Sequence, residues 1–122
     1  MKSLYEIKGI VKTGAKRGKN LGFPTANIEI DEKIPEGIYA AKVAVDGNEY
    51  NAAAFIGAAE TFGEKEFKAE AYILGFSGDI YGKQITIKLF KKLRENKRFD
   101  NKNQLVEQMK KDVLATREFF GE

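Results

Sequence analysis

Apolar residues alternate with polar or small residues through most of this sequence, and they change to a spacing of three to four only near its end. A period of two places every second side chain on one face of a β-strand, whereas the longer period is that of an amphipathic helix. The alternating runs are 5–11, 26–30, 39–45, 50–56, 67–73 and 85–89. The sequence therefore predicts six short strands followed by one helix.

Two local signals set the boundaries of these elements. Asp46-Gly47 interrupts the alternation, and such a pair favours the positive φ angles of a two-residue turn, so 37–57 is predicted to be a hairpin. Asn101 and Gln104 form a capping pair at the start of the helix. The apolar positions of that helix are Leu105, Val106, Met109, Val113 and Phe120.

These elements predict a mainly β fold, either a small antiparallel barrel or a sandwich. Closure of a barrel removes exposed strand edges, and the helix is expected to plug one end. The 122 residues, of which 43% are hydrophobic, fit one domain over 1–122 with an adequate core. Neither a signal peptide nor an apolar stretch of about 20 residues is present, so we expect a cytoplasmic protein without membrane contact.

The chain contains no Cys and no His. The usual zinc ligands, disulfides, thiol nucleophiles and imidazole bases are therefore excluded. Carboxylates, hydroxyls and amides remain, and these can hold a hard cation such as Mg²⁺, which often takes further oxygen ligands from a bound phosphate. A bound nucleotide fits this set of residues.

The net charge of +3 is unevenly distributed. Residues 1–22 and 83–122 are basic, whereas residues 23–82 are acidic. A basic lobe can attract polyphosphate or nucleic acid, but such clusters are also common as solvated faces. Charge alone does not decide between these readings.

The segment from Gly14 to Gly22 carries the densest chemical signal. Gly14, Gly18 and Gly22 are spaced four residues apart, which allows backbone N–H groups to approach an anion closely. Positive charge is added by Lys16, Arg17 and Lys19. The segment resembles a phosphate-binding loop without the ending of a Walker A motif, and the structural alternative is a flexible basic loop between two strands.

The residues that follow favour phosphate binding. Pro24 fixes φ at the start of a strand, and Thr25 and Asn27 project a hydroxyl and an amide from one face of it. Two oxygen ligands beside the loop are suited to sharing Mg²⁺ with the β- and γ-phosphates of a nucleotide. The structural alternative is a capped strand entry with no ligand.

The residues of this loop and of the strand after it resemble those of a known family. The stretch from Arg17 to Asn27, Arg-Gly-Lys-Asn-Leu-Gly-Phe-Pro-Thr-Ala-Asn, is similar to the signature of the riboflavin kinases. Further similarities follow in the same order at Gly37-Ile38-Tyr39-Ala40, Glu70, Asp79-Ile80-Tyr81-Gly82, Leu93-Arg94 and Phe99. The resemblance extends from about Gly9 to Arg117 and so covers nearly the whole chain.

The resemblance implies a six-stranded antiparallel Greek-key β-barrel with a C-terminal α-helix. It implies a phosphotransferase acting on an alcohol group, which makes FMN and ADP from riboflavin and ATP with Mg²⁺. In bacterial bifunctional relatives an FAD-forming domain precedes this module, and this chain shows no such domain, so we expect FMN as the end product. We expect a monomer that does not bind nucleic acid.

The resemblance also assigns roles to particular residues. Glu70 would be the catalytic base, and Arg94 and Phe99 would lie on the flavin side. Thr25 and Asn27 would contact Mg²⁺ and phosphate. The nucleotide and its phosphates would be bound by Gly14, Lys16, Arg17, Gly18, Lys19, Gly22, Pro24, Thr25 and Asn27.

The sequence around Glu70 supports its assignment independently. Apolar neighbours in 67–73 would partly desolvate the carboxylate and allow it to accept a proton, although a single Glu in a strand usually faces solvent. The chain departs from the family pattern in two segments. Residues 55–62 read Phe-Ile-Gly-Ala-Ala-Glu-Thr-Phe, where an Asn before Ile-Gly and then Pro-Thr-Phe are usual, and Glu95-Asn96 stands where Pro-Glu is usual. Both departures bear on substrate contacts and loop order more than on phosphate transfer.

Two other classes of function remain as alternatives. A catalytically degenerate flavin- or nucleotide-binding barrel would have no reason to keep Thr25, Asn27 and Glu70 together. A single-stranded nucleic-acid binder would need aromatic side chains along a basic groove. The aromatic residues of this chain show no such stripe.

Overall fold

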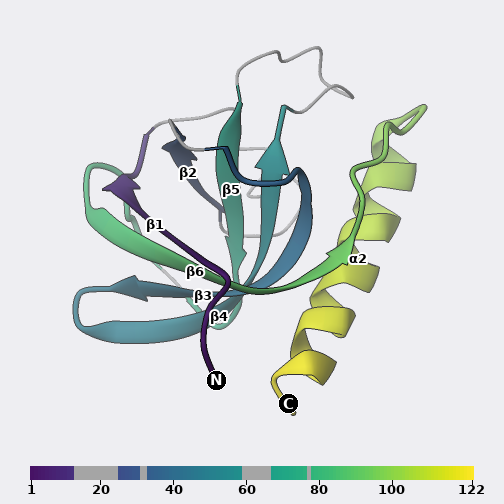
Figure 1. Cartoon of the computed structure of the whole chain (residues 1–122). Coiled ribbons are helices and arrows are strands. Elements are labelled where there is room, and N and C mark those ends of the chain that lie inside the picture. Colours follow the sequence, from purple (N-terminus) through teal and green to yellow (C-terminus); the bar gives the residue numbers. More distant parts are fainter. Residues whose placement is uncertain (13–24, 31–32, 59–66, 77) are drawn as a thin grey trace.

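Six antiparallel strands and one helix make up the described part of the chain, and the fold is mainly β (Figure 1). The computed structural model describes residues 1–12, 25–30, 33–58, 67–76 and 78–122. The elements are β1 (Tyr5–Ile10), β2 (Thr25–Glu29), β3 (Gly37–Val45), β4 (Asn48–Gly57), β5 (Lys68–Ile73), β6 (Gln84–Arg94) and α2 (Lys102–Phe119). The predicted strands and helix are confirmed.

The strands form one sheet in the order β1-β6-β3-β4-β5-β2. All neighbours run antiparallel, and the pairs β1–β6, β6–β3 and β5–β2 join strands that are not consecutive, as in a Greek key. The sheet curls, and the N–H of Lys12 donates to the carbonyl of Asn27 at 2.9 Å between its two outer strands. This bridge brings the ends of the sheet together, so the barrel is confirmed.

Gly9 allows β1 to approach β2 at this closure. A Cβ atom at Gly9 would lie 2.5 Å from Cγ2 of Ile28, closer than two carbon atoms can pack. Elsewhere in the sheet, Asp46 (φ 51°) and Gly47 (φ 80°) form the two-residue turn of the β3–β4 hairpin. Positive φ at both turn residues matches the twist of the paired strands.

The alternating apolar residues fill the inside of the barrel. The buried inward side chains include Ile7, Ala26, Ile28, Tyr39, Ala41, Val43, Ala52, Ala54, Ile56, Ala69, Ala71, Ile73, Ile85, Ile87 and Leu89. The Tyr39 hydroxyl donates to the carbonyl of Pro35 at 2.6 Å, and burial raises the pKa of the Tyr39 phenol above its ordinary value. The intervening residues, including Thr25, Asn27 and Glu70, therefore lie on the outer face.

Helix α2 lies against the outside of β3, β4 and β6, so the expectation that it plugs one end of the barrel is wrong. Ala40 and Ala53 are paired on the outer face and are fully buried. Their small side chains allow the helix to approach the sheet, where Met109 packs with Ala53 and Tyr72. The sheet therefore has apolar contacts on both faces at this point.

The two ends of the helix are fixed in different ways. At its start, the Asn101 side chain accepts a hydrogen bond from the N–H of Gln104 at 3.0 Å, which confirms the predicted cap. At its end, the Phe120 ring packs edge-on against Phe90 and Phe119. No helix within the described ranges is long and apolar enough to span a membrane.

The contact between helix and sheet gives a stability prediction. Met109→Ala should lower the free energy of unfolding by about 2–5 kcal/mol, because it leaves a cavity between α2 and the outer face of the sheet. Leu114→Ala is the matched control on the same helix, since Leu114 is 59% exposed. Urea unfolding followed by circular dichroism measures both, and equal losses would contradict this packing.

Candidate active site

One row of residues crosses the outer face of the sheet and contains three of the predicted site residues, Asn27, Glu70 and Arg94. Asn27 on β2 lies opposite Glu70 on β5, and Glu70 lies opposite Phe55 on β4. Phe55 in turn lies opposite Ile38 on β3, and Ile38 lies opposite Arg94 on β6. Adjacent strands are about 4.8 Å apart, so Asn27 and Glu70 are immediate neighbours, whereas Arg94 lies roughly 14 Å from Glu70 along the sheet.

The oxygen ligands predicted on β2 are buried beside the carboxylate. Thr25 is 6% exposed and Asn27 is 5% exposed, although both lie on the outer face. Oδ1 of Asn27 is buried and has no hydrogen-bond partner within the part of the chain that the structure describes. A buried amide oxygen without a partner costs free energy, which a ligand can recover.

This arrangement fits a hard divalent cation shared with a phosphate. Asn27 Oδ1 and the Thr25 hydroxyl are neutral oxygen donors of the type that Mg²⁺ accepts. Among the residues that the structure describes, no group of three or more carboxylates forms a metal cage. A cation held here would therefore take further ligands from water and from a bound phosphate.

Glu70 is buried, as its apolar neighbours on the strand suggested, although a single Glu in a strand usually faces solvent. Its side chain is 1% exposed, and Oε2 lies 3.8 Å from Nζ of Lys68, whose side chain is 11% exposed. Lys68 and Glu70 are two residues apart on β5 and so share the outer face. The site thus combines a buried carboxylate, a cation and an amide oxygen.

At the other end of the row, Arg94 makes a two-pronged ion pair with the helix. Its Nε and Nη2 donate to the two carboxylate oxygens of Asp112 at 2.8 and 2.7 Å. The Asp112 side chain is 4% exposed, and it also accepts a hydrogen bond from Gln108 at 3.1 Å. This ion pair fastens the end of β6 to α2.

The segment between β6 and α2 is held to the end of β4. Nδ2 of Asn96 donates to the carbonyl of Ile56 at 3.1 Å and to Oε1 of Glu36 at 3.4 Å. A Cβ at Gly57 would lie 2.6 Å from that Nδ2, so glycine permits the approach. Nζ of Lys92 also pairs with Glu95 at 2.6 Å. Glu95 and Asn96, which differ from the family pattern, therefore both make defined contacts in this structure.

The structure brings some of the predicted site residues together and leaves others apart. Thr25, Asn27 and Glu70 form one cluster on β2 and β5. Arg94 lies at the far end of the row, and Phe99, which is 8% exposed, lies in the segment before the helix. The predicted phosphate-loop residues Gly14, Lys16, Arg17, Gly18, Lys19, Gly22 and Pro24 lie outside the described residues.

Sequence reasoning missed Lys68 and Asp112. The spacing of Lys68, two residues before Glu70 on a predicted strand, was a usable signal because it places both on one face. Asp112 lies four residues after Gln108 and four before Thr116, so it shares a helix face with both, but its partner Arg94 is distant in sequence. Only the fold could reveal that pairing.

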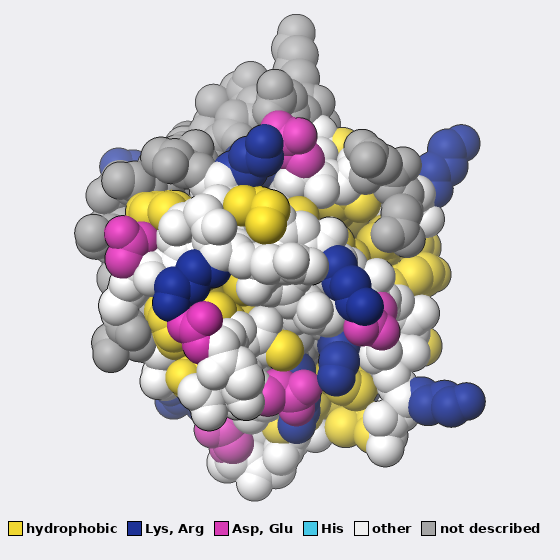
Figure 2. All heavy atoms as spheres, turned by 90° about the vertical axis from the view of Figure 1, so that its left-hand side faces the viewer, with side chains coloured by type: hydrophobic (Ala, Val, Ile, Leu, Met, Phe, Trp, Pro, Cys, Tyr) yellow, Lys and Arg dark blue, Asp and Glu magenta, His cyan; other side chains and the backbone are white. Residues whose placement is uncertain are grey.

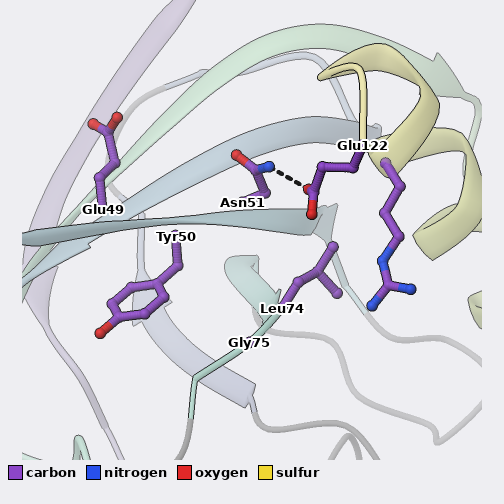
Figure 3. Close-up of a pocket in the computed structure, with 7 residues that line it drawn as sticks. Glu49, Tyr50, Asn51, Leu74, Gly75 and Glu122 are labelled. Atoms are coloured by element: carbon purple, nitrogen blue, oxygen red, sulfur yellow. Dashed lines mark hydrogen bonds between the residues drawn. The ribbon is translucent and has the colours of Figure 1, made fainter.

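A separate hollow of about 280 Å³ lies between the start of β4 and the end of the chain (Figure 3). Its lining residues are Glu49, Tyr50, Asn51, Leu74, Gly75, Arg117 and Glu122. The Asn51 amide donates to the Glu122 carboxylate across it (Figure 3). Asn51 is four residues from Phe55 along β4, roughly 13 Å, so this hollow is distinct from the cluster at Glu70.

Basic and acidic side chains are interspersed on the face of the barrel away from the helix (Figure 2). Over the described part of the chain, Lys42 and Lys88 pair with Glu49, and Lys83 pairs with Asp46. On this face the described residues show no continuous basic stripe of the kind that tracks a nucleic-acid backbone.

The fold and site define a small antiparallel barrel with neutral side-chain oxygen atoms beside a buried carboxylate, an arrangement suited to phosphoryl transfer. The sequence model of the family described as Flavokinase, riboflavin kinase, matches residues 1–120. The chain therefore belongs to the riboflavin kinase family.

Individual relatives agree with this assignment. The trifunctional protein RibF/MnmA of Mycoplasmoides gallisepticum is 40% identical over 119 residues, which cover 95% of this chain and 18% of that protein. The bifunctional riboflavin kinase/FMN adenylyltransferase of Bacillus subtilis is 38% identical over 123 residues, 96% of this chain and 39% of that protein. The chain thus spans between 18% and 39% of the length of these curated relatives.

Two solved structures share the fold. Riboflavin kinase from Trypanosoma brucei superposes with a TM-score of 0.64 at 28% identity, covering 96% of this chain and 77% of that one. A protein from Streptococcus pneumoniae described as a macrolide-efflux protein superposes with a TM-score of 0.79 at 34% identity, covering 92% of this chain and 38% of that one.

The ion pair between β6 and α2 should stabilise the fold. Asp112→Asn should lower the free energy of unfolding by about 1–3 kcal/mol, because the Arg94 guanidinium loses its charged partner in a largely buried place. Glu107→Gln is the control, since Glu107 forms an exposed pair with Lys110 on the same helix and should change stability by less than about 0.5 kcal/mol. Thermal and urea unfolding would contradict the role of the pair if the two variants behaved alike.

Proposed function

We propose that this chain transfers the γ-phosphoryl group of ATP to the terminal ribityl hydroxyl of riboflavin, giving FMN and ADP. The observation that carries the proposal is the placement of Asn27, with its unpartnered buried Oδ1, directly opposite the buried Glu70. Family membership supports ATP, a divalent metal ion and FMN as the other components. We propose that residues 1–122 form a single monomeric kinase domain and that the metal ion is Mg²⁺.

Each of the three site residues that the structure describes has a distinct part in the proposed reaction. Thr25 and Asn27 would hold Mg²⁺, which when bound neutralises charge on the phosphate oxygens. The Glu70 carboxylate accepts the proton when the O–H bond of the ribityl hydroxyl breaks. The hydroxyl oxygen then forms a bond to the γ-phosphorus, and the bond from that phosphorus to the bridging oxygen breaks and releases ADP.

The remaining assignments come from the sequence and belong to the same proposal. The loop from Gly14 to Gly22 would cover the nucleotide phosphates, with backbone N–H groups and with Lys16, Arg17 and Lys19 as donors. The flavin would bind near Arg94 and Phe99, at the end of the row that lies away from Asn27. In the structure the Arg94 guanidinium is bound to Asp112, so its contribution to a flavin site runs through the position of the 95–101 segment.

The direct test is to incubate the protein with riboflavin, ATP and Mg²⁺ and to separate the flavins by chromatography. FMN formed at catalytic turnover, and abolished by a metal chelator, supports the proposal. Flavin binding without FMN would support the alternative of a degenerate barrel. That alternative is less well supported, because Thr25, Asn27 and Glu70 lie together on the outer face.

Replacement of the base should separate chemistry from binding. Glu70→Gln keeps the size and hydrogen bonding of the side chain but removes the proton acceptor, so kcat should fall by roughly 10²–10⁴-fold. Affinity for ADP with Mg²⁺, measured by titration calorimetry, should persist. Glu49→Gln on β4, which is far from the site, is the control, and a Glu70→Gln enzyme of near wild-type rate would remove Glu70 as the base.

Replacement of the metal ligand should affect binding and chemistry together. Asn27→Leu should weaken ADP binding in the presence of Mg²⁺ by about ten-fold or more, with little effect on the metal-free affinity. Asn51→Leu makes the same change on the same outer face, beside the hollow at Glu122, and should leave both affinities unchanged. If Asn27→Leu binds ADP normally with Mg²⁺, Asn27 does not hold the metal.

A further inference from the structure

Phe55 lies in the middle of the row, beside Glu70, and the proposed reaction gives it no role. It is opposite Glu70 of β5 on one side and opposite Ile38 of β3 on the other. Residues directly opposite each other in an antiparallel pair have Cβ atoms about 4.5–5.5 Å apart, so the Phe55 side chain leaves the sheet next to that of Glu70. An aromatic ring therefore borders the place where the reacting hydroxyl would lie.

The Phe55 ring takes little part in the packing of the protein itself. Its neighbours Ala54 and Ile56 point into the barrel and are fully buried, whereas Phe55 lies on the outer face and is only partly buried. Among the residues that the structure describes, Phe55 belongs to neither apolar cluster and contacts no other aromatic ring. A partly exposed aromatic side chain beside a candidate active site is available to a ligand.

The geometry of phosphoryl transfer puts the acceptor on the same side of Glu70 as Phe55. The attacking oxygen and the leaving oxygen lie roughly in line, on opposite sides of the phosphorus. Thr25 and Asn27, which would hold the metal ion and the phosphates, are on β2, at one side of β5. The acceptor would therefore extend from Glu70 in the other direction, across β4 at Phe55 and toward Arg94.

We propose that Phe55 is a specificity-determining residue of the acceptor site, where its ring packs against the planar ring system of the flavin. This inference rests on the proposed function. A phenylalanine offers no hydrogen bond to the hydroxyls of the ribityl chain, whereas it suits offset or edge-on packing with another aromatic ring. The contribution of this position to affinity should therefore depend on the ring system of the acceptor and not on its sugar chain.

The test separates ring binding from turnover by using lumiflavin, which has the flavin ring system but no ribityl chain and so cannot accept the phosphoryl group. Phe55→Ala should weaken lumiflavin binding by about ten-fold, because an aromatic contact and its buried apolar area are lost. Titrations followed by flavin fluorescence measure this affinity. In the FMN-forming assay the same variant should raise the KM for riboflavin by a similar factor and leave the KM for ATP unchanged.

Two further variants and a control sharpen the test. Phe55→Tyr keeps the ring and should bind lumiflavin as the wild type does. Phe55→Leu keeps apolar volume without the ring, so it should weaken lumiflavin binding by about three-fold, and it serves if Phe55→Ala folds poorly. Phe90→Ala is the matched control, because Phe90 on β6 packs edge-on against Phe120 at the end of the helix. Its affinity for both flavins should equal that of the wild type.

Other results would overturn the proposal. A raised KM for riboflavin with unchanged lumiflavin affinity would place Phe55 against the ribityl chain, and equal losses of flavin and ADP–Mg²⁺ affinity would make its role structural. Unchanged affinity for both flavins would remove Phe55 from the acceptor site. A wild type that makes no FMN would contradict the proposed function instead, and the lumiflavin titrations tell the two failures apart.

Discussion

The pairing of β2 with β5 is the constraint on which the candidate site depends. Asn27 comes to lie beside Glu70 only because the two strands pair in one register. A slip of one residue would turn Thr25 and Asn27 into the barrel and Ala26 and Ile28 out of it. Burial of the apolar residues on the inner face therefore fixes the positions of the polar residues on the outer face.

The outer face of the sheet serves two purposes along its length. On β3 and β4 the small side chains of Ala40 and Ala53 let the helix pack closely against it. The Arg94–Asp112 ion pair joins that helix to the end of β6. Toward β5 and β2 it carries the buried polar cluster. Because both regions belong to one hydrogen-bonded sheet, the segment between β6 and α2 is held at a set distance from Glu70.

Glu70 holds a carboxylate in a place that is almost fully removed from water. A carboxylate shielded from water accepts a proton from a substrate in a place where solvent does not compete for it. The same shielding makes an uncompensated charge expensive. Oδ1 of Asn27 is also buried, and it has no hydrogen-bond partner among the described residues.

The sequence by itself determined the strands, the turn at Asp46-Gly47, the cap at Asn101 and the family, because each depends on local spacing or on a contiguous motif. It also indicated Thr25, Asn27 and Glu70, whose roles remain a proposal. Only the tertiary structure decided that the helix lies outside the barrel, how completely Glu70 is buried and that Asp112 holds Arg94. These features depend on register and on contacts between residues distant in the chain, which a period of two or three to four residues does not encode.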